Sequence, residues 1–220
     1  MKLKYSIFLL IILSSFSLTN MFSKKTYKYI NNTEGKVEKS TWIIESKDKK
    51  IIIKENSNLE NSTSIYTKDY DLETYSLKSK NNRSNYTMQR DKNILIAKGT
   101  SNGKNISTRH NLGGQNWVQE FKFGLKSFLN SKKHSLDFVI VNPDDLSTNK
   151  LVATKSYIQN ISIDNKNYKV QKVDVSLRGL FSSFWKAEIW YDIKNYDLIK
   201  YKANKGPGTA ISIITLDSVK

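Results

Sequence analysis

Apolar and polar residues alternate with a period of two along most of the chain from Thr26 onward, in short runs rich in Ile, Tyr, Thr and Val. Successive side chains of a strand point to opposite faces, so this pattern predicts half-buried β-strands. Polar turns such as Asn81-Asn82 separate the runs, which indicates an antiparallel sheet. The predicted strands are 37–46, 49–55, 71–79, 85–90, 93–98, 136–141, 150–159, 168–177, 184–191, 198–203 and 209–217.

One segment has a helical period instead. Its apolar positions fall on one face of a helix over 117–130, and they are Trp117, Phe121, Leu125, Phe128 and Leu129. Asn116 is the expected N-cap, with Gln119 three residues later, close to a capping box. A single amphipathic helix among many strands must bury its aromatic face. We therefore predict a mainly β fold: a single curved antiparallel sheet, or half-barrel, with one amphipathic helix packed on its concave face.

The densest aromatic pattern lies in 184–192. Trp185, Ala187, Ile189 and Tyr191 share the face that is apolar, so we expect them to point inward. The opposite face carries charges and Trp190 and is expected to face water.

The alternation slips by one residue in 168–177, because Tyr168 and Val170 are out of phase with Val173 and Val175. A β-bulge at Gln171-Lys172 would bring all of them onto one face and would bend the sheet.

The first twenty residues have the three-part layout of a secretory signal peptide. A basic start at Lys2 and Lys4 precedes an apolar run over 5–13 and a small, polar stretch over 14–20. We expect residues 1–20 to be a signal peptide, either removed or kept as an anchor, and 24–220 to form a single half-barrel-like domain. The expected location is the periplasm or the extracellular space.

Composition narrows the chemistry. The 220 residues contain no cysteine, which excludes disulfides and a diacylglyceryl anchor on cysteine. The formal net charge is +16, but the lysines are spread over many segments. An anionic component of the cell envelope is a possible partner for such a surface, and nucleic acid is not expected.

Motifs of catalysis are missing from the sequence. His110 and His134 are the only histidines, so no metal site is expected, and no cofactor fingerprint occurs. The acidic pair Asp144-Asp145 follows Pro143 and is typical of a turn. No nucleophile or acid–base pair stands out, and we do not expect an enzyme.

The second half of the chain resembles the C-terminal part of a family of exported bacterial proteins with no assigned function. The resemblance covers about 93–216 and depends on Leu177-Arg178-Gly179, on Phe184-Trp185-x-Ala187-x-Ile189-Trp190-Tyr191-Asp192, on Leu198-Ile199-x-Tyr201 and on Gly206-Pro207-Gly208. It implies an open, curved sheet like the half-barrels of LolA-type lipoprotein carriers, and an exported location. It implies no reaction.

Two functions follow from these features. The first is a carrier of a hydrophobic, lipid-like ligand in a groove between helix and sheet. The candidate lining is Trp42, Phe121, Leu125, Trp185, Ile189 and Tyr191. The second is a structural or interaction protein that docks on anionic envelope components. The same six side chains would also serve as an ordinary core.

Overall fold

The computed structural model describes residues 24–179, 185–204, 206 and 208–220. The predicted signal peptide, Phe184 and Pro207 lie outside the described residues.

The first half of the described chain is a series of strands: β1 (Lys24–Thr33), β2 (Lys36–Lys47), β3 (Lys50–Ser57), β4 (Glu60–Thr67), β5 (Leu72–Ser79), β6 (Asn85–Asp91), β7 (Ile94–Ser101) and β8 (Lys104–Asn111). The second half contains β9 (Asn116–Trp117), α1 (Phe121–Gly124), α2 (Lys126–Asn130), β10 (Ser135–Val141), β11 (Thr148–Ile163), β12 (Lys166–Leu177), β13 (Lys186–Asp192), β14 (Leu198–Asn204) and β15 (Ile211–Val219).

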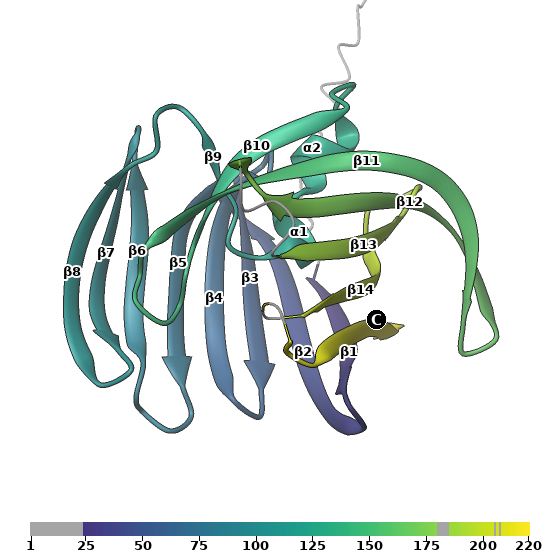
Figure 1. Cartoon of the computed structure of the whole chain (residues 1–220), viewed down its shortest axis with the longest axis horizontal. Helices are drawn as coiled ribbons and strands as arrows, with labels where there is room; N and C mark the ends of the chain where they lie inside the picture. Colours follow the sequence, from purple (N-terminus) through teal and green to yellow (C-terminus); the bar gives the residue numbers. More distant parts are fainter. Residues whose placement is uncertain (1–23, 180–184, 205, 207) are drawn as a thin grey trace, which may run out of the picture.

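All of these strands belong to one sheet, in the order β8-β7-β6-β5-β4-β3-β2-β1-β15-β14-β13-β12-β11-β10-β9 (Figure 1). Every pairing is antiparallel except that of β9 with β10, which is parallel over two residues. The first and last strands are neighbours near the middle of the sheet. Two backbone hydrogen bonds of 2.8 and 2.9 Å join Thr26 to Lys220 there.

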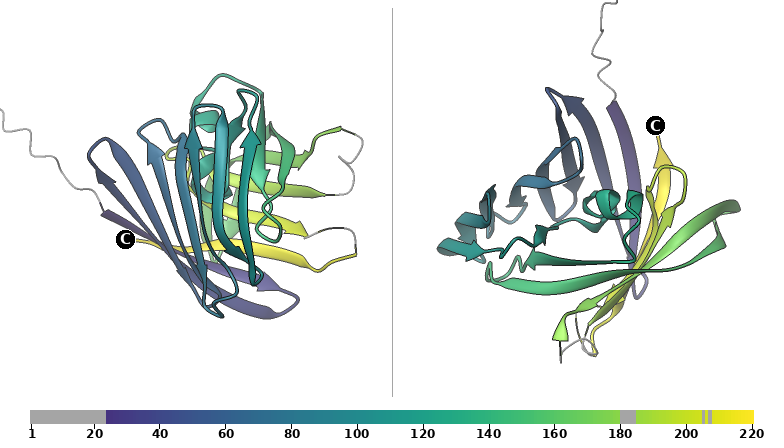
Figure 2. Two further views of the ribbon diagram at one scale, coloured as in Figure 1. Left: turned by 90° about the vertical axis from the view of Figure 1, so that its left-hand side faces the viewer. Right: turned by 90° about the horizontal axis from the view of Figure 1, so that it is seen from above.

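The sheet curves until its two ends approach each other. At the β7–β8 turn, the Ser101 hydroxyl donates to the backbone oxygen of Pro143, in the β10–β11 turn, at 2.6 Å. Asn102 donates to the backbone oxygen of Asp144 at 3.2 Å. The two walls enclose α1 and α2, which lie on the concave face (Figure 2). The predicted architecture, a curved open sheet with its helical segment inside, is confirmed.

The helix differs from its prediction in extent. Asn116 and Trp117 pair with β10, so Asn116 is not an N-cap. The side chain of Gln119 bonds the backbone of Val141 instead of completing a capping box. α1 begins only after Glu120, and Leu125 (φ −98°, ψ 4°) separates it from α2. The β10 backbone offers partners at this edge, and strand pairing therefore prevails over helical periodicity before residue 121.

The phase slip in β12 has a different cause from the one predicted. β12 pairs with β13 without interruption from Val170 to Ser176, so Gln171-Lys172 is not a bulge. The register shift lies in the partner strand β11, between Lys155 and Ile158. Val170 and Val173 are both buried although they point to opposite faces. The buried side of β12 therefore changes along its length.

The inward-facing aromatic prediction is confirmed. Ala187, Ile189 and Tyr191 of β13 are completely buried on the concave side. Trp190 lies on the other face but, contrary to the expectation for that face, is only 8% exposed. The ammonium groups of Lys172 and Lys200 lie over its ring, 5.7 and 5.2 Å from the centre. Such cation–π contacts shield an indole that would otherwise face water.

Candidate functional site

The helical segment, defined here as residues 121–130, is fixed at both ends to the wall that contains β11 and β13. On one side the Tyr191 hydroxyl donates to the backbone oxygen of Phe121 at 2.6 Å. At the other end the Lys155 ammonium donates to the backbone oxygens of Leu129 and Ser131 at 3.1 and 2.6 Å. These contacts satisfy carbonyls at the helix ends, which have no partner within so short a helix.

A buried ion pair fastens the middle of the helical segment. Lys126 Nζ lies 2.7 Å from Asp197 Oδ1, and Tyr27 donates to the same oxygen at 3.2 Å. Burial, together with the neighbouring Asp197 carboxylate, raises the pKa of the Tyr27 hydroxyl. The hydroxyl therefore stays protonated and remains a donor.

The groove expected between helix and sheet is filled by side chains where the two pack. A void between Tyr70 and Phe128, against the helical segment, measures only about 10 Å³. The volume is too small for an organic ligand. Space for a ligand lies beside the helical segment instead.

An apolar hollow of about 420 Å³ opens on the concave face next to α1. Ile140, Leu151, Leu177 and Trp185 contribute its apolar wall. They come from β10, β11, β12 and the residue preceding β13. The volume falls in the lower part of the range of ligand sites, about 300–1,000 Å³.

A stack of rings forms the inner wall beside this apolar hollow. The ring centroid of Phe121 lies 6.5 Å from that of Trp185 and 6.2 Å from that of Tyr201, with nearly parallel planes. Trp185 Nε1 donates to the backbone oxygen of Asn204 at 2.7 Å, which fixes the indole at the rim. Because its only polar atom is satisfied, the indole can present a purely apolar face to the hollow.

The structure divides the six predicted lining residues into groups. Trp185 lines the apolar hollow, and Phe121 stacks on it. Leu125, Ile189 and Tyr191 are completely buried in the core around them. Trp42 lies elsewhere, against Phe123 with ring centroids 5.7 Å apart.

A second hollow, of about 290 Å³, lies on the other side of α1 and is polar. The inner faces of β1 to β3 and the start of β4 line it, with Asn31, Glu38, Glu55 and Glu60 among the contributors. Lys122 of α1 projects into it and lies 4.2 Å from the centre of the Trp42 ring. Tyr201 separates this polar hollow from the apolar one, since it pairs with Ile214 of the polar hollow and stacks on Phe121.

Carboxyl groups in this interior have shifted pKa values. Burial raises the pKa of Glu120 to about 8, with Glu55 and Glu60 adding to the effect and Lys122 opposing it. The Tyr75 hydroxyl donates to Glu120 at 3.4 Å. Burial also raises the pKa of Glu55, against the opposing effects of Lys122 and of a 3.1 Å hydrogen bond from Ser62.

The sequence reasoning missed this polar hollow, although a signal for it exists. Trp42 and Ile53 point inward, so the same strand faces must contain Ser40 and Glu38, and Glu55 and Ser57. Each inner face thus changes from apolar to polar toward one end.

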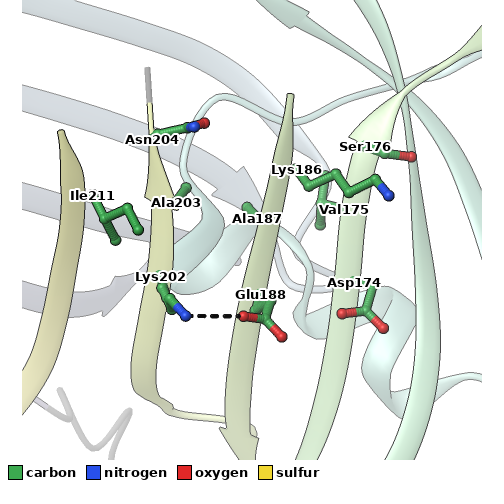
Figure 3. A pocket seen from close by; sticks show the side chains of 10 residues that line it. All are labelled: Asp174, Val175, Ser176, Lys186, Ala187, Glu188, Lys202, Ala203, Asn204 and Ile211. Carbon is green, nitrogen blue, oxygen red and sulfur yellow. Dashed lines mark ion pairs between the residues drawn. The ribbon is translucent and has the colours of Figure 1, made fainter. Parts of the chain in front are cut away.

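The hollow shown in Figure 3 lies on the outer face of β12 to β15 and measures about 600 Å³. Its charges largely neutralise one another. Glu188 lies 3.8 Å from Lys202 and 2.5 Å from Lys172, and Lys172 also pairs with Asp174. We regard it as a solvated charged surface and not as the candidate site.

Within the described ranges, the His, Asp and Glu side chains form no group of three or more that is placed to hold a metal ion. Of the helices that the structure describes, none has the length and apolar character needed to span a bilayer.

The chain matches no known protein family and no curated protein at the level of sequence. Among solved structures, it is similar to a β-barrel-like protein of the domain of unknown function DUF1849 from Brucella abortus. The TM-score is 0.63 at 7% identity, over 90% of this chain and 98% of the other. The chain shares its fold with a domain of unknown function.

Two looser structural matches have TM-scores below one half. One is the hypothetical lipoprotein YmcC from Escherichia coli, with a TM-score of 0.41 at 12% identity, over 89% of this chain and 86% of that one. The other is a LolA superfamily protein from Nitrosomonas europaea, with a TM-score of 0.28 at 9% identity, over 91% and 86%. The similarity to the Brucella abortus protein confirms the resemblance to a domain of unknown function as a likeness of fold.

Proposed function

We propose that this chain is an exported protein of the cell envelope that binds an apolar, lipid-like ligand in the apolar hollow. The observation that carries the proposal is that hollow itself: about 420 Å³ on the concave face, with Trp185 at its rim and Phe121 stacked behind. Burial of one methylene contributes about 0.8 kcal/mol, so a 14-carbon chain gains on the order of 11 kcal/mol before association costs.

The binding test uses a fatty acid of 14 carbons and two tryptophan variants. Trp185→Ala removes the rim of the apolar hollow and should weaken binding at least tenfold. Trp190→Ala is the matched control, because Trp190 lies on the outer face of the adjoining strand. Ile140→Lys, which places a charge in the hollow wall, should weaken binding as Trp185→Ala does.

Organic extraction of the purified protein, followed by mass spectrometry, asks whether a lipid is already bound. Recovery of no lipid together with no fatty-acid binding would refute the proposal. Thermal unfolding of each variant confirms that it is folded. Export is tested separately, by the N-terminal sequence of the protein recovered from periplasm and medium.

A second function is supported by the β11–β12 hairpin, which projects from the sheet (Figures 1 and 2). Tyr157 and Ile158 are 57% and 54% exposed where the hairpin leaves the sheet. Lys166 and Lys169 are exposed further along it. Exposed apolar side chains beside lysines fit an anionic membrane surface, to which the protein would dock.

A further inference from the structure

The polar hollow contains a cation that the protein leaves unpaired. Among the described residues, Lys122 has no ion pair and no hydrogen bond, and its contacts are the ring faces of Trp42 and Tyr29. It projects into a hollow of about 290 Å³ and is only partly exposed. Glu55 and Glu120 interact with Lys122 electrostatically without forming an ion pair with it, so an anionic group of a ligand would be the first to pair directly with this ammonium.

Carboxyl groups on the facing strands also have no close ion pair. Glu38 and Glu55 line the same hollow and form no ion pair among the residues that the structure describes. Glu55 has only the Ser62 hydroxyl as a hydrogen-bond partner, and burial raises its pKa. A ligand cation beside Glu55 would favour its ionised form.

Neutral polar atoms nearby are unsatisfied as well. The side-chain oxygen of Asn31, which lines the polar hollow, is buried without a hydrogen-bond partner in the described part of the chain. The Tyr86 hydroxyl also has no hydrogen-bond partner in the described part of the chain, and its side chain is 2% exposed. Burial raises the pKa of this hydroxyl, and the charges of Glu60 and Glu120 raise it further. Buried polar groups are nearly always hydrogen-bonded, so a polar ligand that reached these atoms would gain hydrogen bonds with them.

We propose that the polar hollow binds a zwitterionic group that contains a phosphate and a primary ammonium, with Lys122 pairing the phosphate and Glu55, with Glu38, pairing the ammonium. A simple anion would face the carboxylates, and a simple cation would face Lys122, so the mixed charges select a group that has both. Phosphoethanolamine has both groups, whether it is a free molecule or the headgroup of a lipid.

This inference rests on the proposed function, because a lipid would place its chain in the apolar hollow and its headgroup in the polar one. Tyr201, which stacks on Phe121 and pairs with Ile214, lies between the two hollows along this wall.

The test compares three probes that have the same acyl chain: lysophosphatidylethanolamine, lysophosphatidylglycerol and the fatty acid. Calorimetric titration should show at least tenfold tighter binding of the ethanolamine lipid than of the glycerol lipid. Lys122→Met and Glu55→Gln should each remove this preference and leave the fatty-acid affinity within twofold. Lys122→Arg should retain it, and Lys54→Met, on the outer face of the same strand as Glu55, should change nothing.

The outcomes separate the two proposals. Equal binding of both lipids, with normal fatty-acid binding, overturns the headgroup inference and leaves the proposed function standing. Absence of binding for all three probes and for free O-phosphoethanolamine overturns both. Binding of free O-phosphoethanolamine as tightly as the lipid, lost in Lys122→Met, supports the zwitterion site and identifies a soluble ligand as its source.

Discussion

The Lys126 ammonium lies 2.7 Å from the Asp197 carboxylate, with only 10% and 5% of the two side chains exposed. Lys126 also donates to the backbone oxygen of Asn195 at 3.1 Å. The pair joins α2 to the β13–β14 turn across the concave face. It therefore fixes the position of the helical segment that separates the two hollows.

Replacement of Lys126 by Met should destabilise the protein by about 3–5 kcal/mol, because Asp197 is then buried without a cation. Urea unfolding followed by circular dichroism measures the change. Lys122→Met is the matched control on α1, since Lys122 has no ion pair among the described residues, and it should cost far less. The double variant Lys126→Met/Asp197→Leu should recover part of the lost stability. A Lys126→Met protein as stable as the parent would contradict a stabilising role of the Lys126–Asp197 pair.

The pKa of Glu120, about 8 in the folded protein against 4.5 as its ordinary value, predicts a pH dependence of stability. Between these pH values the unfolded chain has lost the proton that the folded chain retains. The free energy of unfolding contributed by Glu120 therefore falls as pH rises from about 4.5 to about 8, and is constant below that window.

Glu120→Gln should remove this dependence. Its advantage in melting temperature over the parent should grow between pH 5 and pH 8. Tyr75, Lys122, Glu55 and Glu60 surround the group and remain unchanged in the variant. A difference in melting temperature that is the same at both pH values would contradict the raised pKa.

The sequence predicted strands well where one face is apolar and the other polar. β4 and β8 escaped prediction because Ser, Thr and Asn occupy their inner as well as outer positions, as in Ser62 and Ser64. These two segments form strands because their backbones pair with neighbouring strands, and no local sequence pattern encodes that pairing. The prediction of the helix start failed for the same reason, since Trp117 pairs with β10, which is close to it in space but distant in sequence.

For the candidate site, the alternation of side chains along the strand predicted the inward face of β13 but not which residues would cover that face. Trp185 and Ile189 share a face, yet one lines a hollow and the other is completely buried. The difference depends on where Phe121 packs, which is a property of the tertiary structure. Trp42 was grouped with them as an inward aromatic, although it lies on the opposite wall.

Gly99 is required by a close approach of β6 to β7. A Cβ at this position would lie 2.3 Å from the Asn85 backbone oxygen and 2.6 Å from Tyr86 Cα, and φ is +137°. Gly99→Ala should therefore cost roughly 2–4 kcal/mol in thermal or urea unfolding. Gly103→Ala is the control, because φ is +80° but nothing lies within 4 Å, so it should cost only about 1–2 kcal/mol.

The β2–β3 turn contains a residue in an unfavourable conformation. Asp48 and Lys49 have φ of 48° and 63°, the pattern of a type I′ turn, in which glycine is preferred at the second position. Lys49→Gly should stabilise the protein by about 0.5–1 kcal/mol, since relief of the left-handed strain exceeds the entropy that glycine loses. Lys47→Gly, in the paired strand next to the turn, should instead destabilise it, and stabilisation by both substitutions would contradict a turn-specific effect.

Membrane docking through the β11–β12 hairpin predicts a loss of vesicle binding in the double variant Tyr157→Ser/Ile158→Ser. Cosedimentation with phosphatidylglycerol vesicles should fall severalfold, because two largely exposed apolar side chains no longer enter the interface. Val37→Ser/Leu59→Ser is the matched control, since these side chains are 55% and 60% exposed on other hairpins. Binding of the parent should weaken as salt rises, because Lys166 and Lys169 act through a screened attraction. An equal loss of vesicle binding in both double variants would indicate nonspecific binding through exposed apolar side chains and would exclude the hairpin as a specific docking surface.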